Sequence, residues 1–500
     1  ISSWLPHIRV AKCDVANLSV SRNIGIAMAQ GDIVAFIDDD AIPEPEWLTQ
    51  LAEAYIDPGV GAAGGLVYNH TGYDFQYKYC LVDRFGNADL SLPGPTPHLS
   101  FPKSERYPHL LGCNSSFRRS ALLEIGGFDE EFEYFLDETD VCLRLVDAGY
   151  IITQLPNAYV HHKYAPSNIR GENKVVRYRY PIIKNKIYFM FKHAKEFHSM
   201  ERIMQEQQSF VQSHRNDVTW CHAQKLLCDI DVKNFDSDLQ RALEVGLKRA
   251  VDGVSPDAMI NANKLKQFAG EFLPFTLSHA EKYVSVILIS RDFPPRHDGG
   301  IATFTKDLAE SLAALGNLVH VITQSPDINR VDFEHGIWVH RIELGEFELS
   351  HQARERNIPK HVWNWSATAL EEAKRIATHR KIDAIEAPIW DCEGVAFLFD
   401  KRWPLITSLH TTLDFWLDSH PYKRNDKKSM NTFFTPMLCL ERELMLKSDA
   451  VRANSKAIVY GIEERYRIQI PKSAVKLVPH GMAPAVGALE KKANSGIEIL

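Results

Sequence analysis

A chain of 500 residues is too long for one ordinary hydrophobic core, so we expect two or three domains. Hydrophobic residues make up 45% of the chain and charged residues 24%, which is typical of a soluble globular protein. The formal net charge of −7 gives no electrostatic reason to expect a nucleic acid as a partner.

The first third of the chain, residues 1–166, alternates short apolar runs with helical patterns, which indicates an α/β domain. Residues 17–30 predict a helix that ends at Gly31. Residues 33–37 (IVAFI) predict a buried strand that runs directly into three acids, Asp38, Asp39 and Asp40. Residues 46–55 then predict a helix, with one face formed by Trp47, Leu48, Leu51 and Tyr55.

The pattern changes at about residue 167. Residues 167–282 are polar and rich in helical patterns, which predicts a helical extension followed by a linker. A second α/β unit covers residues 283–500, because a strand pattern begins at Val284 and a loop ending in two glycines follows it.

Within this second unit, residues 301–315 predict a helix with five inward apolar side chains, namely Ile301, Phe304, Leu308, Leu312 and Leu315. Further strands are predicted at residues 318–323, 383–386, 404–409, 449–453 and 475–478, which together indicate a doubly wound, Rossmann-like sheet. The last residues, 497–500 (IEIL), resemble the first strand of another unit. The chain also lacks an initiator methionine, so we expect it to be a fragment.

Three consecutive acids at the end of a buried strand predict a cation site. Self-repulsion and desolvation disfavour such a cluster unless a cation neutralises it. Asp38 and Asp40 are two residues apart on an extended chain and so point to the same side. Their oxygen atoms suit Mg²⁺ or Mn²⁺, which can in turn hold a diphosphate. A solvated turn before the next helix is the alternative interpretation.

The segments around these acids resemble family-2 glycosyltransferases across residues 1–165. The similar blocks occur in the family's order: Ser21-Arg22-Asn23-Ile24-Gly25, Ala29–Ile33, Phe36–Ala41, Pro45–Leu48, Gly112-Cys113-Asn114, Gly126–Glu130 and Leu136–Leu145. The resemblance implies the GT-A fold and an inverting transfer of a sugar from a nucleotide-diphosphate donor.

The resemblance also implies roles for individual residues. Asp38, Asp39 and Asp40 form the DxD motif, in which Asp38 and Asp40 bind the metal and the diphosphate. Arg22 and Asn23 face the nucleotide, a structural ion pair being the alternative role for Arg22. His161 matches a position that ligates the metal in some members. Asn114 resembles a residue that contacts the acceptor or the sugar, and an Asx turn is its alternative role.

An inverting transfer needs a carboxylate to take the proton of the acceptor hydroxyl. Asp137 and Asp140 have the spacing of a helix capping box, which leaves Glu138 without a structural task. Glu138 also aligns with the usual base of the family, although the order Asp-Glu-Thr-Asp departs from the commoner Glu-Asp-x-Asp. We therefore prefer Glu138 as the base, with Asp137 as the alternative.

Residues 284–500 resemble the N-terminal half of family-4 glycosyltransferases, which have the GT-B fold and usually retain configuration. The similar segments are the loop with Gly299 and Gly300, Glu386-Ala387-Pro388, Leu409–Thr412, Ser455-Lys456 and Val478–Gly481. The resemblance implies that the glycine loop lies at the anion-binding start of a helix. It also implies that His410 is an active-site histidine near the sugar, a core histidine being the alternative, and that the donor-binding half lies beyond residue 500.

The sequence thus predicts a bifunctional glycosyltransferase that adds sugars to a glycan or a lipid-linked acceptor in surface polysaccharide assembly. A non-catalytic nucleotide-sugar or glycan-binding scaffold is the alternative from another class. A nucleotidyltransferase also uses paired aspartates with Mg²⁺, but we find no glycine-rich nucleotide loop followed by a lysine.

The expected location is the cytoplasm, at the inner face of the membrane if the basic segment binds lipid. The eight cysteines are scattered without a CxxC pair, which favours a reducing compartment. No apolar run approaches the roughly 20 residues of a membrane span. Residues 170–195 interleave eight basic residues with five aromatic ones, which suits a headgroup surface. Ordinary packing of this segment as a helix is the alternative.

Overall fold

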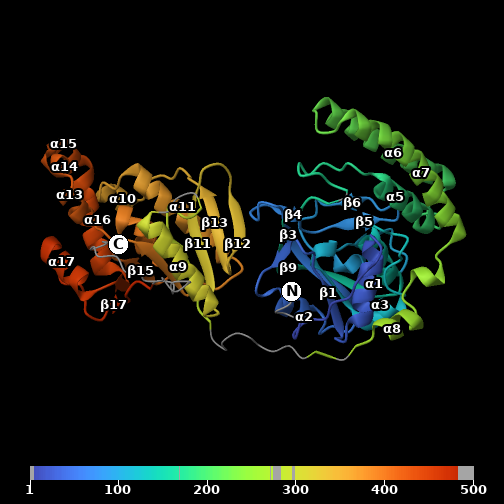
Figure 1. Cartoon of the computed structure of the whole chain (residues 1–500), viewed down its shortest axis with the longest axis horizontal. Helices are drawn as coiled ribbons and strands as arrows, with labels where there is room; N and C mark the ends of the chain where they lie inside the picture. The colour runs from blue at the N-terminus through green and yellow to red at the C-terminus, as the bar shows by residue number, and fades with distance from the viewer. Residues whose placement is uncertain (1–4, 168, 271, 274–282, 296–298, 482–500) are drawn as a thin grey trace, which may run out of the picture. The chain divides into compact units, whose positions relative to one another are not determined.

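The computed structural model describes residues 5–167, 169–270, 272–273, 283–295 and 299–481. The chain forms two compact units, Ile1–Ser278 and His279–Leu500 (Figure 1). Each unit is described by itself below.

The first unit is built on a six-stranded sheet of the order β1-β8-β3-β9-β2, with β4 paired to β3. Its strands are β1 (Ile33–Phe36), β2 (Ala41–Pro43), β3 (Val60–Tyr68), β4 (Phe75–Tyr77), β8 (Ser115–Arg118) and β9 (Ile151–His162). β3 and β9 run parallel, whereas the other neighbours are antiparallel. A smaller sheet contains β5 (Leu81–Asp83), β6 (Ala88–Asp89) and β7 (Arg106–Pro108). This mixed α/β architecture is the GT-A type expected from the sequence.

The helices that cover this sheet are α1 (Leu18–Met28), α2 (Trp47–Ala54), α3 (Arg119–Glu124) and α4 (Asp137–Asp147). The predicted helices at residues 17–30 and 46–55 are confirmed. Asn17 begins α1, because its side chain accepts a hydrogen bond from the backbone N–H of Val20 at 3.1 Å. In α2, Trp47 and Leu51 are buried as predicted, but Leu48 is 60% exposed, so its inward assignment is wrong. Leu48 lies beside the apolar stripe of a short surface helix rather than within it.

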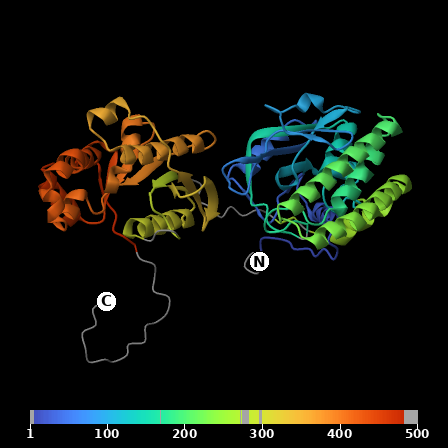
Figure 2. The same ribbon diagram turned by 90° about the horizontal axis from the view of Figure 1, so that it is seen from above.

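The helices between residues 180 and 268 form a helical layer on the first unit. It contains α5 (Tyr180–His193), the two long adjacent helices α6 (Met200–Ala223) and α7 (Asp229–Asp252), and the short α8 (Ala262–Phe268) (Figures 1 and 2). Ile183, Ile187 and Met190 of α5 are fully buried and share one core cluster with Leu239 and Ala242 of α7. The predicted helix-rich extension therefore packs as part of this compact unit.

Helix α5 lies within residues 170–195, for which a membrane-facing surface stays a prediction, and several of its side chains are packed inside the unit. Tyr188 and Phe189 are at most 1% exposed, and they pack against the core of the first unit. Lys186 is also buried and donates a hydrogen bond to Asn87 at 2.6 Å. These aromatic and basic side chains are used inside the protein, so helix α5 follows the packing alternative. None of the helices in the described ranges has the length and hydrophobicity that a bilayer crossing requires.

The second unit is built on an eight-stranded sheet of the order β12-β13-β11-β10-β14-β15-β16-β17. Its strands are β10 (Ser285–Ile289), β11 (Leu318–Ser325), β12 (Arg330–Glu334), β13 (Ile337–Glu343), β14 (Ala384–Pro388), β15 (Leu405–Ser408), β16 (Ala450–Ala453) and β17 (Val475–Leu477). All neighbours are parallel except β12, which forms an antiparallel hairpin with β13. The Rossmann-like sheet and all of its strands that were predicted from the sequence are confirmed, except that residues 497–500 lie outside the described residues.

The strand order of this second sheet reverses between β10 and β14. Ligands of doubly wound sheets bind at such a switch point, outside the carboxyl ends of the strands. The helices of this unit are α9 (Gly300–Ala314), α10 (His351–Glu355), α11 (Lys360–Ile376), α12 (Val395–Asp400), α13 (Leu413–Asp418), α14 (Pro421–Asn425), α15 (Lys427–Ser429), α16 (Thr435–Lys447) and α17 (Lys456–Tyr466). Leu315 follows the end of α9 and is 73% exposed, so its predicted inward position is wrong.

Candidate active sites in the two units

The three acids after β1 form a turn in which the backbone N–H of Ala41 donates to the carbonyl of Asp38 at 3.1 Å. The Asp38 side chain is 39% exposed and that of Asp40 is 19% exposed. Both carboxylates face the same imidazole, because His162 Nε2 lies 3.8 Å from Asp38 Oδ2 and 3.2 Å from Asp40 Oδ1. Asp39 is exposed between them.

The histidine beside these acids is His162, and not His161 as the resemblance implies. His161 Nε2 lies 3.0 Å from Glu44 Oε1, and its ring stacks on Tyr68 with the centroids 4.5 Å apart. Both histidines end β9, where successive side chains point to opposite faces of the sheet. A shift of one residue along a strand therefore exchanges the histidine that faces the acids.

Arg22 on α1 is buried and forms a close ion pair with Asp137, the first residue of α4. Its guanidinium also lies 3.9 Å from Glu138 Oε2 and 5.2 Å from the ring centre of Phe128. Burial alone would lower the pKa of Arg22, but Asp137, Glu138 and Asp38 together raise it above its ordinary value. The arginine is therefore a fixed positive charge between the acidic turn and the first turn of α4.

The two candidate bases have different surroundings. The Asp137 side chain is 1% exposed and paired with Arg22, whereas that of Glu138 is 16% exposed. Glu138 Oε1 accepts a hydrogen bond from the backbone N–H of Gly112 at 3.4 Å. Burial raises the pKa of Asp137, while Arg22 opposes this shift.

The predicted capping box is wrong. Helix α4 begins after Leu136, whose backbone φ of 65° is left-handed, and no side chain caps its first turn. Asp137 instead pairs with Arg22. Asp140 is the third acid in the first turn of α4, after Asp137 and Glu138, and it faces the helical layer.

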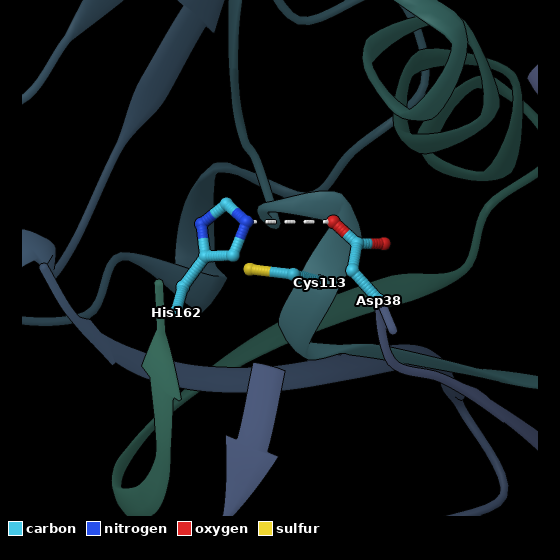
Figure 3. Close-up of side chains that lie close together, drawn as sticks. All are labelled: Asp38, Cys113 and His162. Atoms are coloured by element: carbon cyan, nitrogen blue, oxygen red, sulfur yellow. Dashed lines mark ion pairs between the residues drawn. The ribbon is translucent and has the colours of Figure 1, made fainter. Parts of the chain in front are cut away.

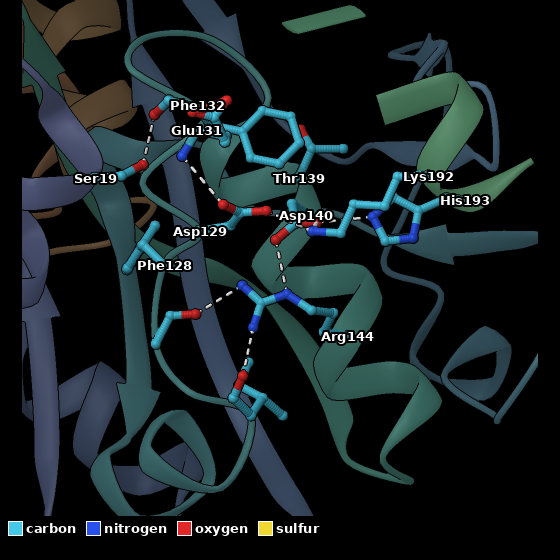
Figure 4. A network of polar contacts seen from close by, with 12 residues as sticks. Ser19, Phe128, Asp129, Glu131, Phe132, Thr139, Asp140, Arg144, Lys192 and His193 are labelled. Carbon is cyan, nitrogen blue, oxygen red and sulfur yellow. Dashed lines mark hydrogen bonds and ion pairs between the residues drawn. The ribbon is translucent and has the colours of Figure 1, made fainter. Parts of the chain in front are cut away.

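Asp140 is held by a cluster of basic side chains that the sequence analysis did not identify (Figure 4). Its Oδ1 accepts from Lys192 Nζ at 2.7 Å and lies 2.7 Å from His193 Nε2, and its Oδ2 accepts from Arg144 Nε at 2.7 Å. Lys192 also donates to Asp129 Oδ2 at 2.8 Å. Burial alone would raise the pKa of Asp140, but the three partners hold it well below its usual range. This cluster joins α5 to the helix that carries both candidate bases.

Asn23 and Asn114 lie near the site, but their amides are used inside the unit. Asn23 exchanges two hydrogen bonds with the backbone of Phe128, at 2.8 and 2.9 Å. Asn114 donates to the carbonyls of Leu66 and Ala158 and accepts from Trp47 Nε1 at 2.8 Å. Both asparagines thus crosslink segments of the unit, and their contacts with a ligand stay a prediction.

In the second unit, a small cavity of about 10 Å³, enough for roughly one water molecule, lies between the sheet and α9. Residues at the carboxyl ends of four neighbouring strands line it: Ile289 of β10, Pro388 of β14, Ser408 and the following His410 at β15, and Arg452 of β16. The cavity therefore adjoins the switch point of the sheet. Burial lowers the pKa of His410 to about 4, with Arg452 and His480 adding to the shift, so its ring is neutral at pH 7.

Glu386 of β14 also lines this cavity and is neutralised within the unit. Arg452 Nε donates to Glu386 Oε1 at 2.8 Å, and the guanidinium donates to Ser408 Oγ at 2.7 Å. Ser408 in turn donates closely to Glu386. Gly299 and Gly300 are exposed at the start of α9, and no contact in the described part of the chain crowds either of them.

Comparisons with known proteins agree with the two units. Residues 1–126 match the family model described as glycosyl transferase family 2, and residues 298–485 match glycosyltransferase family 4. A glucosyl-dolichyl phosphate glucuronosyltransferase of Haloferax volcanii is 30% identical over 164 residues, which is 31% of this chain and 50% of that protein. The succinoglycan biosynthesis protein ExoM of Rhizobium meliloti is 30% identical over 154 residues, which is 30% of this chain and 45% of that protein.

The chain spans about half the length of these curated relatives. A solved structure of GalNAc-T7 with UDP, GalNAc and Mn²⁺ matches 35% of each chain at 16% identity and a TM-score of 0.26, a likeness too distant to support an argument. The two family matches cover separate units, and each agrees with the architecture of its unit. This chain is therefore similar to two glycosyltransferase families, to family 2 in its first unit and to family 4 in its second.

Proposed function

We propose that the first unit transfers a sugar, with inversion, from a nucleotide-diphosphate donor to a glycan or a lipid-linked acceptor. The observation that carries this proposal is the convergence of Asp38, Asp40 and His162 at the carboxyl end of β1, in the unit that matches family 2. The relatives that act on a dolichyl phosphate sugar and in succinoglycan biosynthesis support an acceptor that is a lipid-linked sugar or a polysaccharide precursor.

The residues of the turn fit a divalent cation. The carboxylates of Asp38 and Asp40 each have an oxygen within 4 Å of the His162 imidazole. Burial raises the pKa of Asp38, although Arg22 and His162 oppose this shift. Oxygen-rich sets of this kind suit Mn²⁺ or Mg²⁺. Asp38 and Asp40 would hold the ion, and when bound the ion supplies positive charge to the diphosphate of the donor.

Glu138 and Arg22 have separate roles in the proposed inverting transfer. Glu138 is the proposed base, because its carboxylate is the more exposed of the two candidates and lies 3.9 Å from Arg22, whereas Asp137 pairs closely with this arginine. It takes the proton of the acceptor hydroxyl as that oxygen attacks the sugar. Arg22 fixes Asp137 and thereby the first turn of α4, on which Glu138 stands.

For the second unit we propose a retaining transfer in which His410, at the edge of this small cavity, faces the acceptor or the sugar. The position of this cavity at the carboxyl ends of β10, β14 and β15 supports the assignment. The neutral imidazole of His410 can accept a hydrogen bond from a sugar hydroxyl there.

Binding and turnover of nucleotide sugars test the function of the first unit. Calorimetry of a donor panel with and without Mn²⁺ should show metal-dependent binding, and Asp40→Asn should weaken it by roughly 10²-fold, since affinity follows the charge count of the ligands. Asp32→Asn changes an exposed acid just before β1 and is the matched control. Equal affinity of Asp40→Asn and the unchanged protein would refute the metal site, and binding without release of the nucleoside diphosphate would favour a scaffold.

A further inference from the structure

A thiol lies within the proposed cation site and has no part in the transfer described above. The Cys113 sulfur, a carboxylate oxygen of Asp38 and an imidazole nitrogen of His162 all lie within 4.8 Å of one another. Figure 3 shows the three side chains converging from three different elements. Asp38 follows β1, His162 ends β9, and Cys113 belongs to a single 3-10 turn, Gly112–Asn114, that precedes β8.

The neighbours of Cys113 hold its side chain in this place. Asn114 is fixed by its three hydrogen bonds to Leu66, Ala158 and Trp47. Gly112 is enclosed by Arg22 and Glu138, so that an added Cβ would collide with the Arg22 guanidinium. Cys113 is itself 2% exposed, whereas Asp38 at 39% leaves the site open to solvent on one side. The thiol is therefore positioned before any ion arrives, and an ion can enter past Asp38.

The combination of sulfur, nitrogen and oxygen donors differs from the oxygen-rich set that Mn²⁺ and Mg²⁺ prefer. Thiolate and imidazole ligands select Zn²⁺ and similar ions, and Zn²⁺ binds a given site more tightly than Mn²⁺. Donor atoms on one Zn²⁺ are roughly 3.3–3.8 Å apart, as its bond lengths of about 2.0–2.3 Å require. His162 Nε2 lies 3.8 Å from Asp38, and the donor atoms of Asp38, Cys113 and His162 are all within 4.8 Å of one another, so movements of about 1 Å or less would bring them to this spacing.

We propose that Cys113, His162 and Asp38 form a zinc-binding site that shares its ligands with the proposed Mn²⁺ or Mg²⁺ site. On binding, the Cys113 thiol loses its proton to solvent and its sulfur bonds to the ion, with no oxidant or reductant involved. Zn²⁺ then occupies Asp38 and His162, so the catalytic cation cannot bind. The regulatory consequence, inhibition by Zn²⁺, rests on the proposed function, but the site itself does not.

Cobalt substitution tests the sulfur ligand directly. Co²⁺ is added to the whole chain carrying Cys228→Ser and Cys439→Ser, which removes the two exposed thiols that would bind it nonspecifically. A thiolate-to-cobalt charge-transfer band in the near ultraviolet is expected, and it should disappear on addition of Zn²⁺. Cys113→Ala in the same background should abolish the band, and Cys80→Ala, which alters another buried thiol of the first unit, should retain it.

Zinc affinity gives a second measurement, by competition with a chromophoric chelator. Loss of a residue that hydrogen-bonds a metal ligand typically lowers metal affinity by about 10–100-fold. Cys113→Ala removes a ligand itself, so it should lower Zn²⁺ affinity by at least this factor. Its Mn²⁺ affinity should fall by a smaller factor, and the ratio of the two affinities does not depend on the fraction of folded protein. His162→Ala should weaken both ions.

Two outcomes separate this inference from the proposed function. If Mn²⁺ and the donor bind but Co²⁺ gives no thiolate band, the zinc site is refuted and the proposed function stands. If the band and tight Zn²⁺ binding occur but no donor binds with Mn²⁺, the proposed function fails while the zinc site stands. Equal Zn²⁺ affinities for Cys113→Ala and its parent would also overturn the zinc site.

Discussion

Acidic side chains at the ends of strands have different surroundings in the two units. In the first unit, Asp38 and Asp40 are partly exposed and share one imidazole, that of His162. In the second unit, Glu386 is 15% exposed and is paired with the guanidinium of Arg452, which is 8% exposed. The charge of Glu386 is balanced by its own buried cation, whereas the acidic turn would gain stability from the divalent ion that we propose binds there.

This difference predicts how each unit responds when one charge is removed. The first unit should lose function without losing its fold, because its site residues lie at a partly open surface. The second unit should lose stability, because its acid and base neutralise each other inside the unit. The following three experiments test this contrast, from the largest expected effect to the smallest.

The largest effect concerns Glu138. Glu138→Gln should lower turnover by roughly 10²–10⁴-fold, as expected when a general base is lost, and should leave donor affinity close to that of the unchanged protein. Steady-state kinetics with the best donor of the panel measures this change. Asp137→Asn is the comparison variant, and it should also lower thermal stability, because Arg22 would lose its buried partner. A near-normal rate for Glu138→Gln would show that Glu138 is not the base.

The second effect concerns Arg452. Arg452→Met should destabilise the second unit by about 3–5 kcal/mol, because it leaves the partly buried Glu386 carboxylate without its cation. Hydrogen exchange followed by mass spectrometry reports β14–β16 separately from the first unit. Arg402→Met removes an arginine that is 52% exposed and should cost less than about 1 kcal/mol. If the double variant Arg452→Met/Glu386→Gln is no more stable than the single one, the unpaired charge is not the cause.

The smallest effect is a pH dependence that belongs to the second unit. Burial raises the pKa of Glu393 to about 8, although hydrogen bonds from Trp365 Nε1 and the backbone N–H of Arg291 oppose this shift. In the unfolded chain the same carboxyl loses its proton near its ordinary pKa of 4.5. Between these two values the folded state binds more protons, so the stability of the second unit falls as pH rises from about 4.5 to 8.

Glu393→Gln keeps an oxygen that accepts both hydrogen bonds and removes the titration. It should therefore flatten the stability profile by at most about 1.4 kcal/mol per pH unit. Urea unfolding at pH 5, 6, 7 and 8 measures the slope. Glu355→Gln is the control, because its side chain is 57% exposed. Parallel profiles for Glu393→Gln and the unchanged chain would show that Glu393 does not set the slope.

The sequence predicts regular elements well where apolar periodicity is strong. The strands at residues 33–37, 318–323 and 404–409 are confirmed. Those at 318–323 and 404–409 lie inside the second sheet, where apolar runs of strand length pack on both faces, whereas β1 is an edge strand of the first sheet in which only Val34 is buried. The hairpin of β12 and β13 was missed, since residues 330–334 (RVDFE) alternate only briefly at the edge of the sheet.

The candidate sites show where sequence reasoning ends. Asp38 and Asp40 follow directly from a strand that runs into acids, and the structure places both beside one histidine. The choice between His161 and His162 depends on the pleat of β9, which no local pattern reveals. The buried roles of Asn23 and Asn114 depend on partners more than 40 residues away along the chain, which only the folded structure brings together.

The cluster around Asp140 bears on how such a catalytic domain can be divided or recombined. A chain cut at residue 166 would keep Asp38, Asp40 and Glu138 but would lose Lys192 and His193, two of the groups that neutralise Asp140. Asp129 would lose its lysine at the same time. Asp140 would then keep only Arg144 of these three partners, and Asp129 would also lose its hydrogen bond from Tyr188. When this catalytic domain is exchanged between proteins in evolution, we therefore expect helix α5 to be inherited together with residues 1–166.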